Sequence, residues 1–163
     1  MLRTFFFIFI CLLFLNPNTS VANFFTSDNY WEGKTAYDKG DYKTALKLWE
    51  QSANNGISEA ESFVGSLYHS GQGTKKDYKK AMVLYLKSAK QGISRSQLAI
   101  GTMYADGHGV KKNNIVARMW FTIAQINKHE QANQYIKKID LRMTYQEIIK
   151  SDKKAIIWLN ANR

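Results

Sequence analysis

A period of 36 residues constrains this chain more than any other feature of its sequence. Five positions of one unit recur 36 residues later in the next: Gly65, Tyr68, Gly71, Gly73 and Ala81 return as Gly101, Tyr104, Gly107, Gly109 and Ala117. The same spacing relates Ala45 to Ala81, and Trp49 to Tyr85 and Phe121. A unit of this length cannot bury an apolar face alone, so the sequence predicts a stack of similar units.

Each unit is predicted to be a pair of helices. In the first helix, Ala60 and Val64 follow the spacing of a single apolar face. The segment 71–73 is then a turn, because two glycines so close together favour a left-handed helix end. Asp77 and Asn113 stand at the expected N-caps of the second helices. The expected fold class is therefore all-α, a right-handed α-solenoid of stacked antiparallel helix hairpins.

Small side chains are expected to let helices approach closely, and large side chains are expected to fill the space between hairpins. Gly65 and Gly101 fall in the middle of the first helices, where glycine costs about 1 kcal/mol relative to alanine. This cost indicates that a neighbouring backbone packs against the missing side chain, with Ala81 and Ala117 as the expected contacts. The large residues one turn further are expected to form an aromatic ladder between hairpins: Trp49, Tyr85 and Phe121.

Four hairpins are expected, over residues 28–57, 58–93, 94–129 and 130–162. In the last one Lys137 replaces the packing glycine, which is typical of a terminal unit that faces solvent. Thr144 and Glu147 form the capping-box pattern of a final helix. The apolar face of that helix is expected to contain Ile148, Ile149, Ala155, Ile156 and Leu159, with Trp158 near its end.

The run from Ile100 to Val110, Ile-Gly-Thr-Met-Tyr-Ala-Asp-Gly-His-Gly-Val, resembles the Sel1-like repeat family of tetratricopeptide-like helical proteins. The segment from Gly33 to Ala45 has a shorter turn and looks more like a tetratricopeptide repeat. The resemblance covers roughly residues 29–162. It implies an interaction or assembly role in the bacterial envelope or in contact with a host.

The first 22 residues are predicted to be a signal peptide. Arg3 precedes an apolar run of about 11 residues, from Phe5 to Leu15, which is short of the ~20 that a membrane-spanning helix needs. Cleavage is expected after Ala22, because small residues stand at both ends of Ser20-Val21-Ala22; a short uncleaved anchor is the alternative. The mature chain, residues 23–163, is then a single repeat domain without a transmembrane helix, in the periplasm or secreted.

Composition narrows the chemistry of the mature chain. The single cysteine, Cys11, lies in the apolar run, so no disulfide, cysteine nucleophile or cysteine metal ligand remains after cleavage. The formal net charge, +10 for the whole chain and +9 once Arg3 has left with the signal peptide, favours acidic partners, such as an anionic envelope polymer, a lipid surface or an acidic protein. Nucleic acid is the least expected partner of an exported protein.

Neither a catalytic centre nor a metal or cofactor site is expected. His69, His108 and His129 occupy unrelated positions in the repeat and lack neighbouring ligands at metal-binding spacing. The sequence has no Gly-x-Ser-x-Gly motif and no phosphate-binding loop. Some cysteine-rich members of the Sel1-like family are linked to penicillin binding and β-lactam hydrolysis, but this chain lacks their paired cysteines.

Two surfaces are candidates for binding. The first helix of each hairpin should supply a concave face, formed by Ser62, Ser66, His69, Leu98, Thr102 and Ala105. The equally weighted alternative is that these residues only flank the apolar stripe and have no binding role. Lysines at the same position of successive repeats should form a basic ridge that consists of Lys75, Lys76, Lys111 and Lys112. This ridge could bind an anionic partner, or it could serve only to keep the protein soluble.

The leading function is an exported, non-catalytic scaffold or adaptor that binds a partner protein through its concave face. The alternative is a cell-envelope enzyme or binding module that acts on peptidoglycan or another anionic envelope polymer. A compact pocket with converging titratable groups would favour the enzyme, and an open groove would favour the scaffold.

Overall fold

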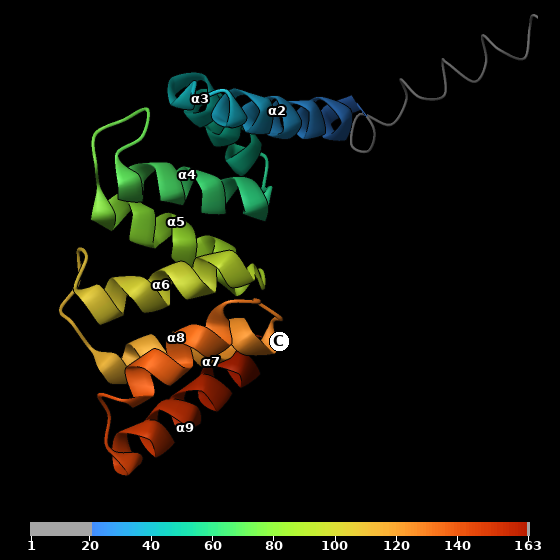
Figure 1. Cartoon of the computed structure of the whole chain (residues 1–163). Helices are drawn as coiled ribbons and strands as arrows, with labels where there is room; N and C mark the ends of the chain where they lie inside the picture. Colours follow the sequence, from blue (N-terminus) through green and yellow to red (C-terminus); the bar gives the residue numbers. More distant parts are fainter. Residues whose placement is uncertain (1–20, 163) are drawn as a thin grey trace, which may run out of the picture.

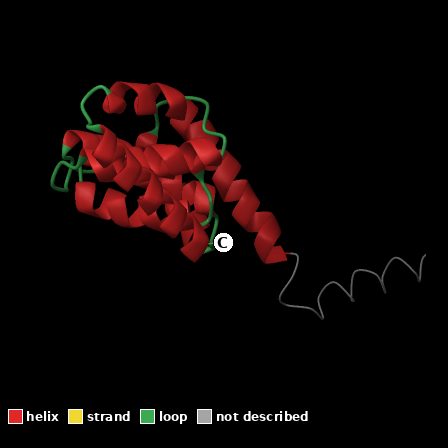
Figure 2. Ribbon diagram, turned by 90° about the horizontal axis from the view of Figure 1, so that it is seen from below, coloured by secondary structure: helices red, strands yellow, loops and turns green. Residues whose placement is uncertain are grey.

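The structure, a computed structural model, describes residues 21–162. The predicted signal peptide lies outside this range except for Val21 and Ala22, so it stays a prediction. The described residues form eight helices joined by short loops (Figure 2). In chain order they are α2 (Val21–Asp38), α3 (Tyr42–Asn54), α4 (Ser58–Ser70), α5 (Tyr78–Lys90), α6 (Ser94–Asp106), α7 (Asn114–Ile126), α8 (Ala132–Asp140) and α9 (Tyr145–Ala161).

The helices pair and then stack. Helix α2 packs on α3, α4 on α5, and α6 on α7, and successive hairpins meet through α3 with α4 and through α5 with α6. Figure 1 shows the resulting stack of helices, with α2 and α3 at one end and α9 at the other. The chain is therefore the all-α solenoid of stacked hairpins that the repeat predicts.

The predicted helix starts are confirmed. Asp77 and Asn113 each accept a hydrogen bond from the backbone N–H three residues further on, at 2.9 and 3.1 Å. Thr144 and Glu147 form both hydrogen bonds of the capping box at the start of α9. Asp41 caps α3 in the same way, at 3.1 Å. The second helix of each unit thus begins at a fixed residue, because a side chain satisfies a backbone donor that the helix leaves free.

The two Gly-x-Gly turns hold successive hairpins together. Gly71 and Gly107 end the first helices in the left-handed conformation, with φ of 79° and 81°. Two residues later, Gly109 comes so close to the start of α5 that an added Cβ would lie 2.5 Å from the Cβ of Tyr78. Gly73 approaches the backbone of Tyr42 in the same manner. Each turn therefore reaches back to the hairpin before it, and only glycine leaves room for this contact.

The mid-helix glycines pack closely, as expected, but mainly against a different neighbour. A Cβ on Gly65 would lie 2.9 Å from the ring of Tyr85 and 3.4 Å from the carbonyl oxygen of Ala81. A Cβ on Gly101 would overlap the ring of Phe121. The aromatic residues therefore fill the space inside each hairpin, because the glycine leaves a ring-sized gap there, and they do not form the predicted continuous ladder.

Aromatic rings still connect some neighbouring hairpins, because the second helix of one hairpin contacts the first helix of the next. Trp49 stacks on Phe63 at 4.4 Å between ring centroids, and Phe121 contacts Tyr135 at 5.2 Å. Ala99 occupies the corresponding position between these two, so the central junction has no such pair. The aromatic contact between hairpins thus depends on a position that the apolar stripe does not predict.

The C-terminal end is built differently. Helices α8 and α9 both pack against α7. Arg118 of α7 forms ion pairs of 2.5 Å with Asp140 at the end of α8 and with Asp152 of α9. Trp120 and Trp158 meet edge to face at 5.0 Å.

The predicted apolar face of α9 is partly wrong. Ser151 and Ala155 are its buried residues, whereas Ile156 is 57% exposed and Ile157 is 67% exposed. The reason is steric: α9 lies against α7 through its small side chains, which turns the isoleucines of its last turns towards solvent.

Candidate partner-binding groove

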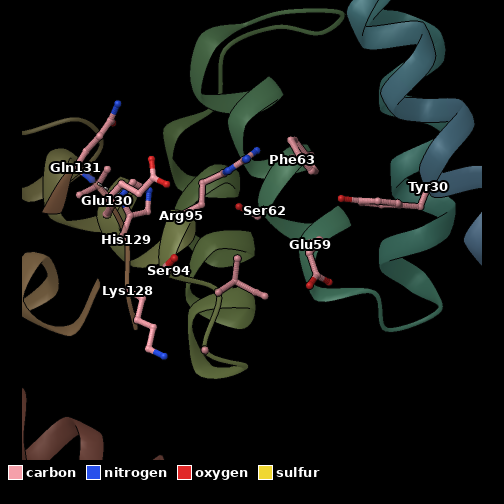
Figure 3. A pocket seen from close by; sticks show the side chains of 13 residues that line it. Tyr30, Glu59, Ser62, Phe63, Ser94, Arg95, Lys128, His129, Glu130 and Gln131 are labelled. Carbon is pink, nitrogen blue, oxygen red and sulfur yellow. Dashed lines mark hydrogen bonds between the residues drawn. The ribbon is translucent and has the colours of Figure 1, made fainter. Parts of the chain in front are cut away.

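An open groove of about 720 Å³ crosses the first helices of successive units. Tyr30 of α2 forms one end, and the loop between α7 and α8 forms the other (Figure 3). Residues of α4 and of the first turn of α6 lie between these ends. The lining side chains include Tyr30, Glu59, Ser62, Phe63, Arg95 and Leu98 from the helices, and Lys128, His129 and Glu130 from the loop.

The centre of the groove is a column of stacked planar groups. The Trp49 ring, fully buried, stacks on Phe63 with an interplanar angle of 18°. The Arg95 guanidinium lies over the Phe63 ring at 4.4 Å from its centroid. A guanidinium held over an aromatic face keeps its N–H edge free for other partners. The column therefore extends from the core to the surface and ends in a positively charged group.

Tyr30 is fixed beside this column. Trp49 donates a hydrogen bond from its indole Nε1 to the backbone carbonyl of Tyr30 at 3.0 Å. The Tyr30 ring contacts Phe63 at 6.1 Å between centroids. Burial raises the pKa of Tyr30, and the charge of Glu59 raises it further, while Arg95 opposes both. Its hydroxyl is consequently a neutral hydrogen-bonding group at physiological pH.

The far wall is the loop after α7. Lys128 adopts a left-handed conformation, with φ of 62°. His129 accepts a hydrogen bond at Nδ1 from the backbone N–H of Gln131, at 3.3 Å. Burial lowers the pKa of His129, as does the nearby positive charge of Arg95, while Glu130 opposes them. His129 is therefore a neutral imidazole near pH 7 that presents Nε2–H as its donor.

Charges line the groove without cancelling each other in pairs. Arg95 and Lys128 are basic, whereas Glu59 and Glu130 are acidic. Within the described chain, none of these four side chains forms an ion pair or a hydrogen bond with another of them. The hydroxyl oxygen of Ser62 is buried and likewise lacks a hydrogen-bond partner. The groove thus holds several polar groups that an incoming ligand can satisfy.

The structure separates the predicted concave residues. Ser62 and Leu98 line the groove but are themselves buried, 1% and 8% exposed. Thr102 and Ala105 line a smaller cavity of about 120 Å³ between α6 and α8. The remaining two, Ser66 and His69, lie further along α4 and do not line the groove. The six residues therefore do not line one common groove.

Two of the histidines occupy unrelated positions in the repeat, as the sequence indicates, but the structure brings their rings together. His69 and His108 lie 5.3 Å apart between ring centroids. His108 stacks on Tyr78 at 4.9 Å with an interplanar angle of 2°, and His69 meets the same tyrosine edge to face at 5.1 Å. The repeat register hides this contact, because the Gly-x-Gly turn of one unit folds back onto the unit before it.

The four ridge lysines are exposed, as expected. Lys75 and Lys76 lie in the loop between α4 and α5, and Lys111 and Lys112 lie in the loop between α6 and α7. Both loops project from the same edge of the stack (Figure 1). None of the four forms an ion pair with a described residue. A shallow depression of about 550 Å³ at the start of α5 is bordered by Lys75, Lys76, Lys79 and Lys80.

Apart from Ser62 and Leu98, the residues that build the groove were not predicted from the sequence, but a signal for them exists. Glu59, Arg95 and Gln131 are separated by 36 residues, as are Phe63, Ala99 and Tyr135. Both columns lie outside the apolar stripe and vary from unit to unit. Positions that share a place in the repeat but differ in chemistry are where a solenoid carries specificity.

Among residues 21–162, no cluster of three or more histidine, cysteine, aspartate or glutamate side chains has the arrangement of a metal site. None of the helices within residues 21–162 has the length and hydropathy needed to cross a membrane.

Glycine-packed helix hairpins in a linear stack define a helical-repeat protein. A family model described as Sel1 repeat matches residues 20–57, 58–93 and 94–124. The chain belongs to the Sel1 repeat family. Proteins of this family are generally scaffolds for protein interaction and are typically non-catalytic.

Solved structures share the fold. One is c5321, described as a protective antigen of uropathogenic Escherichia coli with an SLR fold, at 22% identity and a TM-score of 0.78 over 83% of this chain. Another is a Sel1 repeat protein from Oxalobacter formigenes, at 25% identity and a TM-score of 0.65 over 77% of this chain. The matches span 30% and 54% of those two proteins. No curated protein sequence matches the chain.

Proposed function

We propose that this protein is an extracytoplasmic, non-catalytic scaffold that binds a segment of a partner protein in the groove between Tyr30 and the loop after α7. The observation that carries the proposal is the groove itself, which is open, crosses several repeat units and offers unpaired polar groups beside aromatic rings. A long groove that combines polar groups with aromatic rings suits an extended peptide. Export follows from the predicted signal peptide.

The geometry of the titratable groups supports binding over catalysis. Catalytic acid–base pairs need hydrogen-bond contact or a shared water-sized site. Glu59, Arg95, His129 and Glu130 form no hydrogen bonds with one another in the described chain. A scaffold requires only that such groups stay available to a partner.

Site-specific photocrosslinking in the native host tests the proposal. The full chain carries a photoreactive amino acid at Gln131, on the groove wall, or at Val83, which is 66% exposed on α5. We expect one discrete crosslinked partner in the envelope or culture fraction from position 131 and none from position 83. Equal crosslinking from both positions, or none from either, would refute groove binding. The intact mass of the isolated protein tests export, because cleavage as predicted leaves Asn23 at the N-terminus.

The basic edge favours a second candidate, binding of an anionic envelope polymer. Its support is the set of exposed lysines around the depression at the start of α5, of which Lys75, Lys76 and Lys79 form no ion pair with a described residue. Changing Lys75, Lys76, Lys111 and Lys112 to glutamate lowers the formal net charge by eight and should leave the fold intact, since solvated lysines add little stability. Retention on purified peptidoglycan should then fall sharply at low salt. Unchanged retention would reduce the ridge to a solubilising edge.

A further inference from the structure

We propose that Arg95 is the recognition residue of the groove and receives an aspartate or glutamate side chain of the partner segment. This inference rests on the proposed function and names the chemistry of its partner. The protein itself leaves the guanidinium unpaired: its contact with the Phe63 ring is a stacking contact, and no carboxylate of the described chain lies within ion-pair distance.

The stacking column prepares Arg95 for a carboxylate. Phe63 lies between Trp49, which is fully buried, and the guanidinium, so the column is anchored in the core. A guanidinium fixed by stacking loses less conformational freedom on binding and presents a planar pair of N–H donors. Such a pair matches the two oxygens of a carboxylate.

Donors around Arg95 add to the same site. Helix α6 begins at Ser94 without a side-chain cap, so the backbone N–H groups of Ser94 and Arg95 have no partner within the helix, whereas those of Ser96 and Gln97 donate to the Ile93 carbonyl. The Ser62 hydroxyl is independent of that helix end; it is buried, unpartnered and on the same groove wall. Figure 3 shows Ser62 and Arg95 together in the middle of the groove. These groups favour an anion at the start of α6.

The acidic residues of the groove decide which anion fits. Glu59 and Glu130 line the same surface as Arg95 and Lys128, so the groove has no net positive charge among these four. A phosphate dianion or a polyanionic polymer would meet two negative charges there. A single carboxylate on an otherwise uncharged peptide needs only the guanidinium, and the rings of Tyr30 and Phe63 offer apolar contact beside it. The group that fits best is therefore an acidic side chain in a peptide segment.

Selection from a random 12-residue peptide library displayed on phage, with the whole mature chain as bait, tests the inference. Selected sequences are synthesised with amidated C-termini, so that only side-chain carboxylates can contribute. We expect enrichment of aspartate or glutamate at one position, and a loss of affinity of about tenfold or more when that residue becomes its amide. Arg95→Gln should weaken the acidic peptide by a similar factor.

Combining the two changes separates a direct contact from a general charge effect. In Arg95→Gln protein, converting the peptide carboxylate to an amide should have little further effect, because the two groups act as one pair. Glu59→Gln should strengthen binding a few-fold, and Lys128→Gln, the matched control without a stacking partner, should weaken it by less than Arg95→Gln. Circular dichroism verifies that each variant remains folded.

Each outcome has one meaning. Selected peptides without acidic enrichment, or independent losses from Arg95→Gln and from the peptide amide, overturn the carboxylate contact while the crosslinking result still decides the proposed function. A requirement for a free peptide C-terminus also overturns it, since the carboxylate would then be terminal. Absence of any selected binder overturns this inference, and crosslinking from position 131 in the same protein would show that the scaffold function stands without it.

Discussion

In the central hairpins, a glycine of the first helix admits an aromatic ring from the second, whereas the last two helices hold to the stack through Arg118 and two aspartates. The first contact depends on shape, because a Cβ at Gly101 would overlap the Phe121 ring. The second depends on charge and on a mostly buried guanidinium. The difference predicts that added volume damages the middle of the solenoid and that loss of charge damages its end.

Adding volume at a central glycine should have the largest effect. Gly101→Leu places a side chain where even one carbon would overlap Phe121, so we expect a loss of about 3 kcal/mol of unfolding free energy or failure to fold. Urea denaturation followed by circular dichroism measures this loss. Val83→Leu, the same new residue at an exposed helix position, is the control and should change stability by less than about 0.5 kcal/mol. Equal stability of the two variants would contradict the shape argument.

Removing the charge at the C-terminal end should have the next largest effect. Arg118→Met leaves Asp140 and Asp152 without their partner, and we expect a loss of about 2 kcal/mol. The fluorescence of Trp158, which contacts Trp120 beside this network, should change at lower urea than the helical signal does. Lys34→Met breaks the exposed pair with Asp38 and should cost less than about 0.5 kcal/mol. A loss from Lys34→Met as large as from Arg118→Met would remove the distinction between the two pairs.

The turn contact between hairpins should rank third. His108→Ala removes the ring stacked on Tyr78, which corresponds to about 0.5–1.5 kcal/mol for an aromatic pair. Thermal unfolding measures the change, and Lys111→Ala in the same loop is the matched control. Equal stability of these variants would mean that Gly109, and not His108, keeps the turn in contact with the start of α5.

The smallest effect should come from pH. Burial lowers the pKa of His69, and the charges of His108 and Lys76 lower it further, while Asp106 opposes them. Because the unfolded chain then binds the proton more readily, the unfolding free energy should decrease as pH falls below about 6.5, the ordinary value. His69→Gln should flatten this dependence between pH 7 and 5, measured by urea midpoints in constant salt. A profile that keeps the same slope would show that His69 does not contribute.

The stacking of the repeat was predictable from the sequence, and its partner surface was not. Glycine, alanine and the N-caps act locally, so Gly65, Asp77 and Asn113 could be assigned from spacing alone. The groove instead depends on Arg95 finding the face of Phe63, which lies 32 residues earlier in the chain on a different helix. A pattern of apolar residues contains no information on such contacts between surface positions.

The wrong prediction for Ile156 and the unpredicted contact between His69 and His108 have a common cause. Helical spacing shows which residues share a face, but it does not show which part of that face the neighbouring helix covers. Ser151 and Ala155 let α9 approach α7, and the isoleucine beside them stays exposed. His69 and His108 meet because the turn that contains His108 folds back onto the previous unit. The period of the repeat does not predict this contact.

The turns that reach back have a consequence for how the chain acquires its structure. Gly109 contacts Tyr78, and Gly73 contacts Tyr42, and both pairs span 31 residues of sequence. Each hairpin can therefore dock as soon as the next turn has been synthesised, without closing a loop to any distant part of the chain. A topology of low contact order folds quickly and can nucleate at any unit. A nascent or newly translocated chain can thus become ordered one repeat at a time, in the order in which it emerges.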